Sequence, residues 1–315
     1  MSDLDRMLER WTDAGLITAE QARAIRASEK QDGHAPRATP SIAEVIAYIG
    51  AIFALSAVAF IASRVWEDLA VGAQLGLLAL ATSVFWVGGW WVQGGRNPVR
   101  ERLATVLWFI SAGGLGWFAD VIATDVWDID NGYALIIGLT LSVYAGLLYY
   151  YRRTSLQQIA LAGGVGFLCA GLSDIIGGDD WFGPFLWLAG AGWVALTRSG
   201  LLTPRRTGFA LGGVGVLVGS EAIAFNFFDS PDAFGLILGL ASAAVLLYLS
   251  VSFSEMVLLG FGTVGLFIFV LQIIGEYLGD GIGGPVALLI AGIALLLVAL
   301  VAVRLKDRAK PEKVA

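Results

Sequence analysis

Long apolar runs alternate with short charged connections through most of the chain. Each of ten runs is long enough to cross roughly 30 Å of hydrocarbon as a helix. Helices are expected because lipid offers an open backbone no hydrogen-bond partners. The pattern therefore predicts an all-α, polytopic membrane protein whose spans are 44–63, 69–92, 103–123, 132–151, 156–176, 182–198, 207–228, 233–251, 255–275 and 284–303.

The first part of the chain has an amphipathic pattern instead. Apolar residues recur at helical spacing from Leu4 to Trp11, and Thr18 followed by Gln21 is a capping-box signature for a second helix. Residues 1–31 therefore predict a short, soluble helical hairpin on the cytoplasmic side, too small for an independent core. We expect it to dock on its own membrane domain, on a second copy of the chain or on a protein partner. On the first helix Leu4, Met7, Leu8 and Trp11 share one face, and on the second helix Ala22 and Ile25 are expected to point inward.

The remaining segments complete the predicted domain organisation. Residues 32–43 form a linker with glycine and proline, and 44–303 form the transmembrane domain. Residues 304–315 form a basic cytoplasmic tail. The first apolar run begins only after a polar segment, so no cleavable signal peptide is expected.

The basic residues indicate how the chain is oriented. Of the 20 lysines and arginines, 19 lie on the side that the two ends of the chain share, and Arg64 is the exception. Basic loops are retained in the cytoplasm, so both termini are expected there. One helix more or fewer would place basic connections on both sides, so the alternation also supports an even count.

Composition narrows the class further. The chain is 57% hydrophobic and 15% charged, whereas soluble domains carry roughly 25% charged residues. The net charge of −6 says nothing about partners, because acids and bases lie on opposite sides of the predicted membrane. Membrane lipids are the expected partners, and no nucleic acid is expected.

A glycine pattern repeats along the chain. Gly113-Gly114-Leu115-Gly116, Gly163-Gly164-Val165-Gly166 and Gly212-Gly213-Val214-Gly215 begin 50 and 49 residues apart. With two helices per repeat, successive units keep one orientation and predict parallel, repeated helical hairpins. No strand precedes these glycines, so close helix packing is favoured over nucleotide binding.

One carboxylate lies inside a predicted span. Glu221 is about 22 Å beyond Arg206 at 1.5 Å per residue, within the hydrocarbon, and Asn226 follows it. Intramembrane carboxylates are candidates for function. Glu221 and Asn226 therefore form a candidate polar site for a proton or a cation, to which Gln74 and Gln272 could contribute. The alternative is a carboxyl group that reaches outward or bonds a neighbouring helix.

No cofactor site, metal site or catalytic constellation is predicted. Cys169 is the single cysteine and lies in an apolar run, which is typical of a buried packing residue. His34 is the single histidine and falls in the linker. We therefore expect no enzyme activity.

The N-terminal residues resemble a known family. Trp11, the segment Gly15-Leu16-Ile17-Thr18, Glu20-Gln21 and Ile25, followed by a linker and a string of spans, are similar to the bacterial predicted membrane proteins called domain of unknown function 2157. The resemblance implies an inner-membrane protein and brings no site residues.

Two functional classes stay open. The ten spans, the repeat and Glu221 favour a transporter or channel-like protein for a small ion or solute. The N-terminal hairpin favours a non-transporting scaffold or envelope sensor that docks a partner. A water-filled cavity reaching Glu221 would favour the first class, and a packed interior the second.

Overall fold

The chain forms two compact units, Met1–Asp68 and Leu69–Ala315. The computed structural model describes residues 3–31, 53, 60, 64–66, 68–93, 98–226, 233–277, 285, 289, 292 and 293. These residues form helices joined by turns, and none of them is in a strand. The all-α class is therefore confirmed for the part of the chain that the structure describes.

Two helices form the N-terminal hairpin, α1 (Asp3–Asp13) and α2 (Ala19–Gln31). The turn between them contains Gly15 at φ +68°, a left-handed conformation that suits glycine. The predicted capping box is present: the Thr18 N–H donates to Gln21 Oε1 at 2.9 Å, and the Gln21 N–H donates to Thr18 Oγ1 at 3.2 Å. Local sequence therefore fixes where α2 begins.

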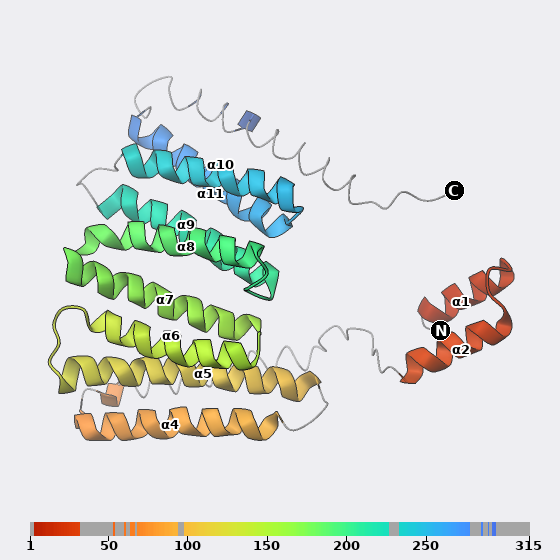
Figure 1. Cartoon of the computed structure of the whole chain (residues 1–315), viewed down its shortest axis with the longest axis horizontal. Helices are drawn as coiled ribbons and strands as arrows, with labels where there is room; N and C mark the ends of the chain where they lie inside the picture. The colour runs from red at the N-terminus through yellow and green to blue at the C-terminus, as the bar shows by residue number, and fades with distance from the viewer. Residues whose placement is uncertain are drawn as a thin grey trace. The chain divides into compact units, whose positions relative to one another are not determined.

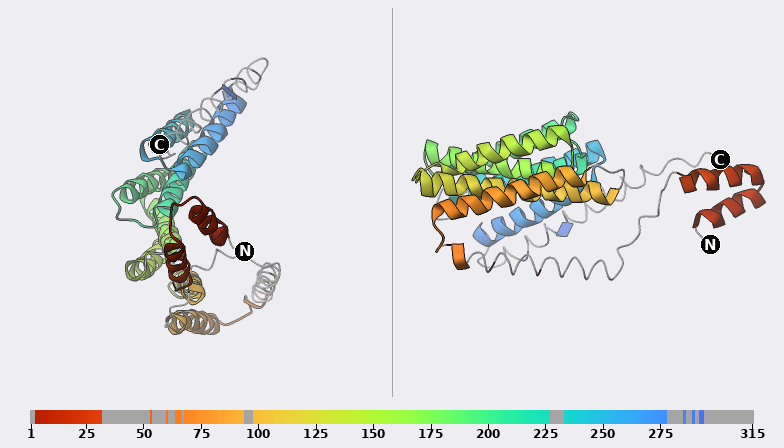
Figure 2. Two further views of the ribbon diagram at one scale, coloured as in Figure 1. Left: turned by 90° about the vertical axis from the view of Figure 1, so that its right-hand side faces the viewer. Right: turned by 90° about the horizontal axis from the view of Figure 1, so that it is seen from below.

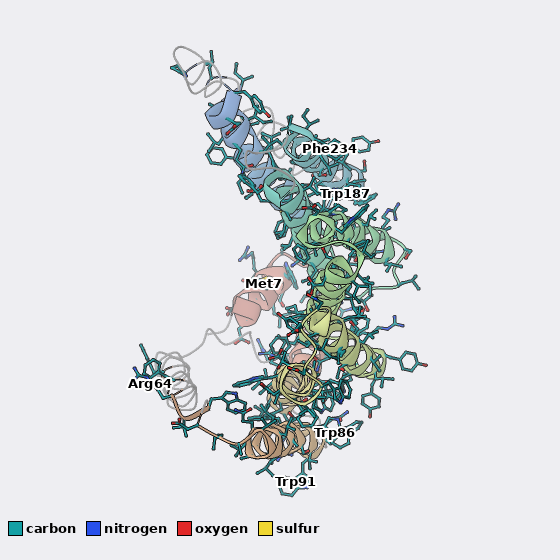
Figure 3. All side chains as sticks on the ribbon, turned by 90° about the vertical axis from the view of Figure 1, so that its left-hand side faces the viewer. Met7, Arg64, Trp86, Trp91, Trp187 and Phe234 are labelled. Carbon is teal, nitrogen blue, oxygen red and sulfur yellow. The ribbon has the colours of Figure 1, made fainter. Side chains whose placement is uncertain are left out.

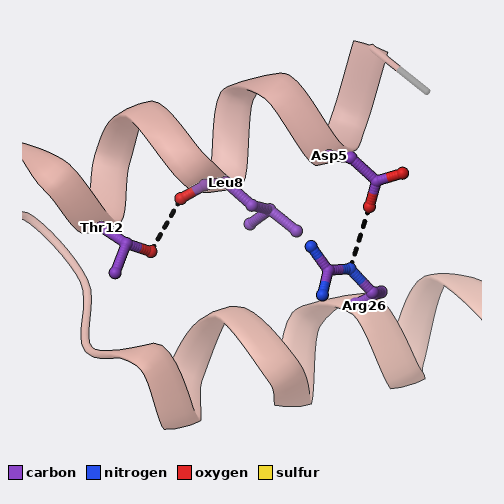
Figure 4. A network of polar contacts seen from close by, with 4 residues as sticks. All are labelled: Asp5, Leu8, Thr12 and Arg26. Atoms are coloured by element: carbon purple, nitrogen blue, oxygen red, sulfur yellow. Dashed lines mark hydrogen bonds and ion pairs between the residues drawn. The ribbon is translucent and has the colours of Figure 1, made fainter. Parts of the chain in front are cut away.

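The two helices are held together by one ion pair and a small apolar contact. Arg26 Nε donates to Asp5 Oδ1 at 2.9 Å, as Figure 4 shows. Leu8 is fully buried and Ala22 is 8% exposed, as predicted. Ile25 remains 37% exposed, so its predicted inward placement is wrong; the contact between two short helices is too small to cover it.

The second unit is a series of long helices (Figure 1). They are α4 (Val71–Val92), α5 (Pro98–Val121) with the π-helical continuation η1 (Ile122–Val126), α6 (Tyr133–Tyr151), α7 (Ser155–Ile176), the 3₁₀ turn η2 (Asp179–Trp181), α8 (Phe182–Arg198), α9 (Arg205–Asn226), α10 (Ala233–Phe253) and α11 (Met256–Tyr277).

Eight predicted spans coincide with α4 to α11. Seven helical stretches in the described residues are long and apolar enough to cross a membrane. The eighth helix, α8, has 17 residues and a length of about 26 Å, slightly less than the hydrocarbon thickness. The predicted spans 44–63 and 284–303 lie almost entirely outside the described residues, as do the linker 32–43 and the tail 304–315. The count of ten therefore stays a prediction.

Two helices begin earlier than predicted. The helix α5 begins at Pro98 instead of residue 103, and α9 begins at Arg205 instead of residue 207. In both cases arginines assigned to a loop lie in the first helical turns, and proline is favoured at the first position of a helix. Charge therefore marks the membrane boundary here, while the helix extends beyond it.

Contacts within this unit follow the order of the chain. The closest pairs are α4 with α5, α6 with α7, α8 with α9, and α10 with α11. The helices α5, α7, α9 and α11 also contact one another in turn. Among the helices that the structure describes, extensive contacts are therefore confined to those that are adjacent or next-but-one in the chain. The right-hand view of Figure 2 shows these described helices side by side, with their axes roughly parallel to one another.

Glycines set the close approach within two of these pairs. A Cβ atom on Gly138 of α6 would lie 2.5 Å from the Leu168 nitrogen in α7 and 3.0 Å from the Gly164 oxygen. A Cβ on Gly190 of α8 would likewise meet the backbone of α9, 3.0 Å from the Gly212 oxygen. Glycine therefore permits helix contact, as predicted, although Gly113 and Gly163 of the repeated pattern would meet nothing within 4 Å.

Candidate functional site

The predicted carboxylate pairs with an amide on a neighbouring helix. Gln272 Nε2 of α11 donates a hydrogen bond to Glu221 Oε1 of α9 at 2.5 Å. Each residue lies five positions before the end of its helix, which is Asn226 in α9 and Tyr277 in α11. The two side chains therefore meet at the same depth, toward the side where the acidic connections are predicted.

Apolar packing brings the two helices together beneath this pair. A Cβ on Gly265 of α11 would lie 2.6 Å from a Leu217 methyl group, so the missing side chain makes room for α9. Phe269, one turn before Gln272, is 1% exposed and packs with Ala224 and Leu217. The hydrogen bond between Glu221 and Gln272 therefore lies beside packed apolar side chains.

Two oxygen atoms of this pair have no partner. Glu221 Oε2 and Gln272 Oε1 are shielded from solvent and accept no hydrogen bond in the structure. An ionised carboxylate and an amide oxygen are both acceptors, so the groups that would satisfy them are a proton, a water molecule or a cation. Two oxygens fall well short of the roughly six ligands that calcium or magnesium requires.

Three cavities among the described residues do not reach this pair. One of about 780 Å³ lies between the basic ends of α5 and α7, and one of about 620 Å³ lies within the N-terminal hairpin. A third, of about 300 Å³, is apolar and lies among α8, α9 and α10. Glu221 and Gln272 line none of these three.

Of the two other predicted polar residues, Gln74 is not brought to the pair. Asn226 is the last residue of α9, but its side chain is outside the part of the structure that is described. Gln74 is buried in α4, which makes no extensive contact with α9 or α11. The described part of the site is therefore Glu221 with Gln272, Gln74 is separate from it, and the predicted contribution of Asn226 stays a prediction.

A second polar region was not singled out from the sequence. Thr105, Gln157 and Gln158 are 8%, 1% and 0% exposed at the basic ends of α5 and α7. Gln157 Nε2 donates to the Thr105 carbonyl oxygen at 3.4 Å, and Thr207 Oγ1 of α9 donates to Ser155 Oγ at 2.8 Å. The available signal is that four of the five residues from Thr154 to Gln158, at the start of a span, are polar and uncharged.

The fold and the apolar helices define the class of this protein. Seven described stretches suited to crossing a bilayer identify it as a membrane protein with several helices. Residues 9–125, from α1 to the end of α5, match the family described as predicted membrane protein (DUF2157). That match confirms the resemblance of the N-terminal residues. No curated protein and no solved structure matches the chain.

Proposed function

We propose that this protein is a non-transporting scaffold of the bacterial inner membrane, with both termini in the cytoplasm, which holds a protein partner through residues 1–31. The proposal includes no catalytic step. The observation that carries it is a hairpin that is folded by its own contacts yet keeps large apolar side chains exposed.

The hairpin has the properties of a docking module. Its helices are set by a capping box and an ion pair, so little order has to be gained on binding. Trp11 is 39% exposed, Met7 is 40% exposed, and Leu16 in the turn is 72% exposed. Tryptophan is over-represented among the residues that dominate binding energy at interfaces. These side chains could be covered by a partner protein or by a second copy of this chain.

The membrane unit supports the same proposal. Transporters commonly place their site between two halves that move against each other. Here extensive contacts among the described helices are confined to chain neighbours and next-but-one helices, and Glu221 is closed by Gln272. The recurrence of glycine contacts between α6–α7 and α8–α9 supports parallel hairpin repeats, of which ten spans would make five.

The test is site-specific photocrosslinking in intact membranes. A photoreactive residue at position 11 is expected to give an adduct with a second polypeptide, which mass spectrometry identifies as a partner or as another copy. The matched control is position 20, because Glu20 is exposed on the same hairpin and polar. Adducts only within the same chain, or the same adducts from both positions, would contradict a docking role.

A second candidate function rests on the two unpartnered oxygens. Glu221 Oε2 and Gln272 Oε1 could bind a proton or a cation during transport of a small ion. In that case Glu221→Gln should abolish flux in proteoliposomes, whereas Glu276→Gln, at an exposed carboxylate near the end of α11, should not. Flux that is unchanged in Glu221→Gln would remove the site from the transport hypothesis.

A further inference from the structure

A basic cavity lies where α5 and α7 meet, outside the region of Glu221. Its volume is about 780 Å³, and its walls come from the start of α5 and from the connection between α6 and α7. Three arginines line it, Arg102, Arg152 and Arg153, together with the Glu101 carboxylate. Three guanidinium groups face one carboxylate, so the lining has two positive charges in excess.

The three arginines differ in whether a carboxylate pairs with them. Arg152 Nη1 donates to Glu101 Oε1 at 2.9 Å, so these two charges neutralise each other. Among the residues that the structure describes, no carboxylate lies within ion-pair distance of Arg102 or Arg153. Guanidinium groups bind phosphate oxygens through paired hydrogen bonds, so two of them at one cavity suit a phosphate group.

Hydroxyl groups and the start of α7 add further donors. Thr154 precedes the first turn of α7, and its side chain makes no capping hydrogen bond. Its Oγ1 is buried and has no partner, although it lines the cavity. Ser155 Oγ accepts from Thr207, which leaves its own proton to donate. The free backbone N–H groups in the first turn of a helix can also donate to an anion, in addition to the contacts that the charged side chains make.

Aromatic residues place this cavity at the level of the lipid headgroups. Trp91 is 89% exposed and points away from the helices in Figure 3, and Tyr150 is 84% exposed. Tyr151 packs on Trp90 with ring centroids 5.0 Å apart and directly precedes Arg152. Exposed tryptophan and tyrosine at the ends of spans mark the boundary between membrane and water.

The cavity is also part apolar. Val106 and Leu156, one from each helix, line it beside the polar groups. A free phosphate ion gains no favourable contact from apolar side chains, whereas the glycerol and acyl carbons of a phospholipid would pack against them. Basic pockets between membrane helices are an established setting for anionic lipid headgroups.

We propose that this cavity binds the phosphate group of an anionic phospholipid, with Arg102 and Arg153 as its main cationic contacts. The lipid then occupies the groove between α5 and α7 at the basic side of the membrane. This inference does not depend on the proposed scaffold function.

Native mass spectrometry of the purified full chain tests the proposal. Dioleoylphosphatidylglycerol should bind at least tenfold more tightly than dioleoylphosphatidylcholine, which has no net charge. Arg102→Gln and Arg153→Gln should each weaken phosphatidylglycerol binding by about tenfold, the effect of losing a charge-assisted hydrogen bond. The matched control is Arg198→Gln, which removes one charge on the same side from a residue outside the cavity, stacked on Phe253.

Several outcomes would overturn this assignment. Equal losses in Arg198→Gln and Arg153→Gln would show a general charge effect instead of a site. Inorganic phosphate that displaces phosphatidylglycerol at equal concentration would indicate a site for soluble phosphate. Arg153→Lys keeps the charge and loses the paired geometry, so it should retain folding and show an intermediate affinity; wild-type affinity in all arginine variants would refute the proposal.

Discussion

The contact between α8 and α9 offers the sharpest test of the packing. Gly190 is buried against α9, and an alanine Cβ there would lie 2.6 Å from the Gly215 carbonyl carbon and 3.0 Å from the Gly212 oxygen. Ordinary carbon contacts are about 3.5–4.0 Å, so the helices would have to separate by about 1 Å. The obstacle is backbone, which cannot turn aside as a side chain can.

The expected loss of stability in Gly190→Ala follows from a comparison with a neighbouring glycine. Gly192 lies two residues further along α8, and a Cβ there would meet nothing within 4 Å. Both Gly190→Ala and Gly192→Ala gain about 1 kcal/mol of helix propensity, so this gain cancels in the difference. Overpacking then predicts that Gly190→Ala is less stable than Gly192→Ala by about 1–3 kcal/mol.

The assay is reversible unfolding of the purified chain in mild detergent, by titration with a denaturing detergent. The free energy of unfolding should be lower for Gly190→Ala, and that for Gly192→Ala should equal or exceed the wild-type value. Equal stability of the two alanine variants would refute the close approach of α8 to α9.

Three further predictions follow from other contacts. Gln272→Leu should destabilise the membrane unit by about 1.5–3 kcal/mol, because it removes the hydrogen bond to the Glu221 carboxylate; detergent unfolding measures this, and a neutral result would contradict the pair. Leu8→Ala should speed the limited proteolysis of residues 3–31 in the full chain much more than Asp5→Asn does, since exposed ion pairs contribute only roughly 0.2–1 kcal/mol; equal cleavage rates would contradict the apolar contact. Glu101→Gln should increase phosphatidylglycerol binding several-fold by freeing Arg152, and a decrease in native mass spectrometry would count against the lipid site.

The sequence predicts the helices well because bilayer thickness imposes their length. The predicted spans from 69–92 to 255–275 all coincide with helices, and the capping box of Thr18 and Gln21 forms as expected. The starts of α5 and α9 were missed because a charged residue can lie in a helical turn outside the hydrocarbon. Hydropathy reports the solvent around a segment and not the hydrogen bonding of its backbone.

Contacts between helices were harder to predict. Gln272 lies 51 residues after Glu221 in the sequence. The two side chains meet because α11 packs directly against α9, although α10 separates these helices along the chain. The repeated glycines predict close packing without showing which of them face a neighbour. Arg152 and Arg153 were recognised as a topology signal, but only the packing of α5 on α7 brings Arg102 to the same cavity.

We propose that these helices cross a membrane with the basic connections in the cytoplasm, and labelling of introduced cysteines tests this topology directly. Cys169 is buried and is the chain's single cysteine, so Cys169→Ser provides a background for introduced cysteines. In intact cells a membrane-impermeant maleimide should label Asp130→Cys and Asp180→Cys, on the acidic connections, and should label Ser199→Cys only after the cells are opened. Labelling of Ser199→Cys in intact cells, or protection of either acidic connection, would contradict the topology.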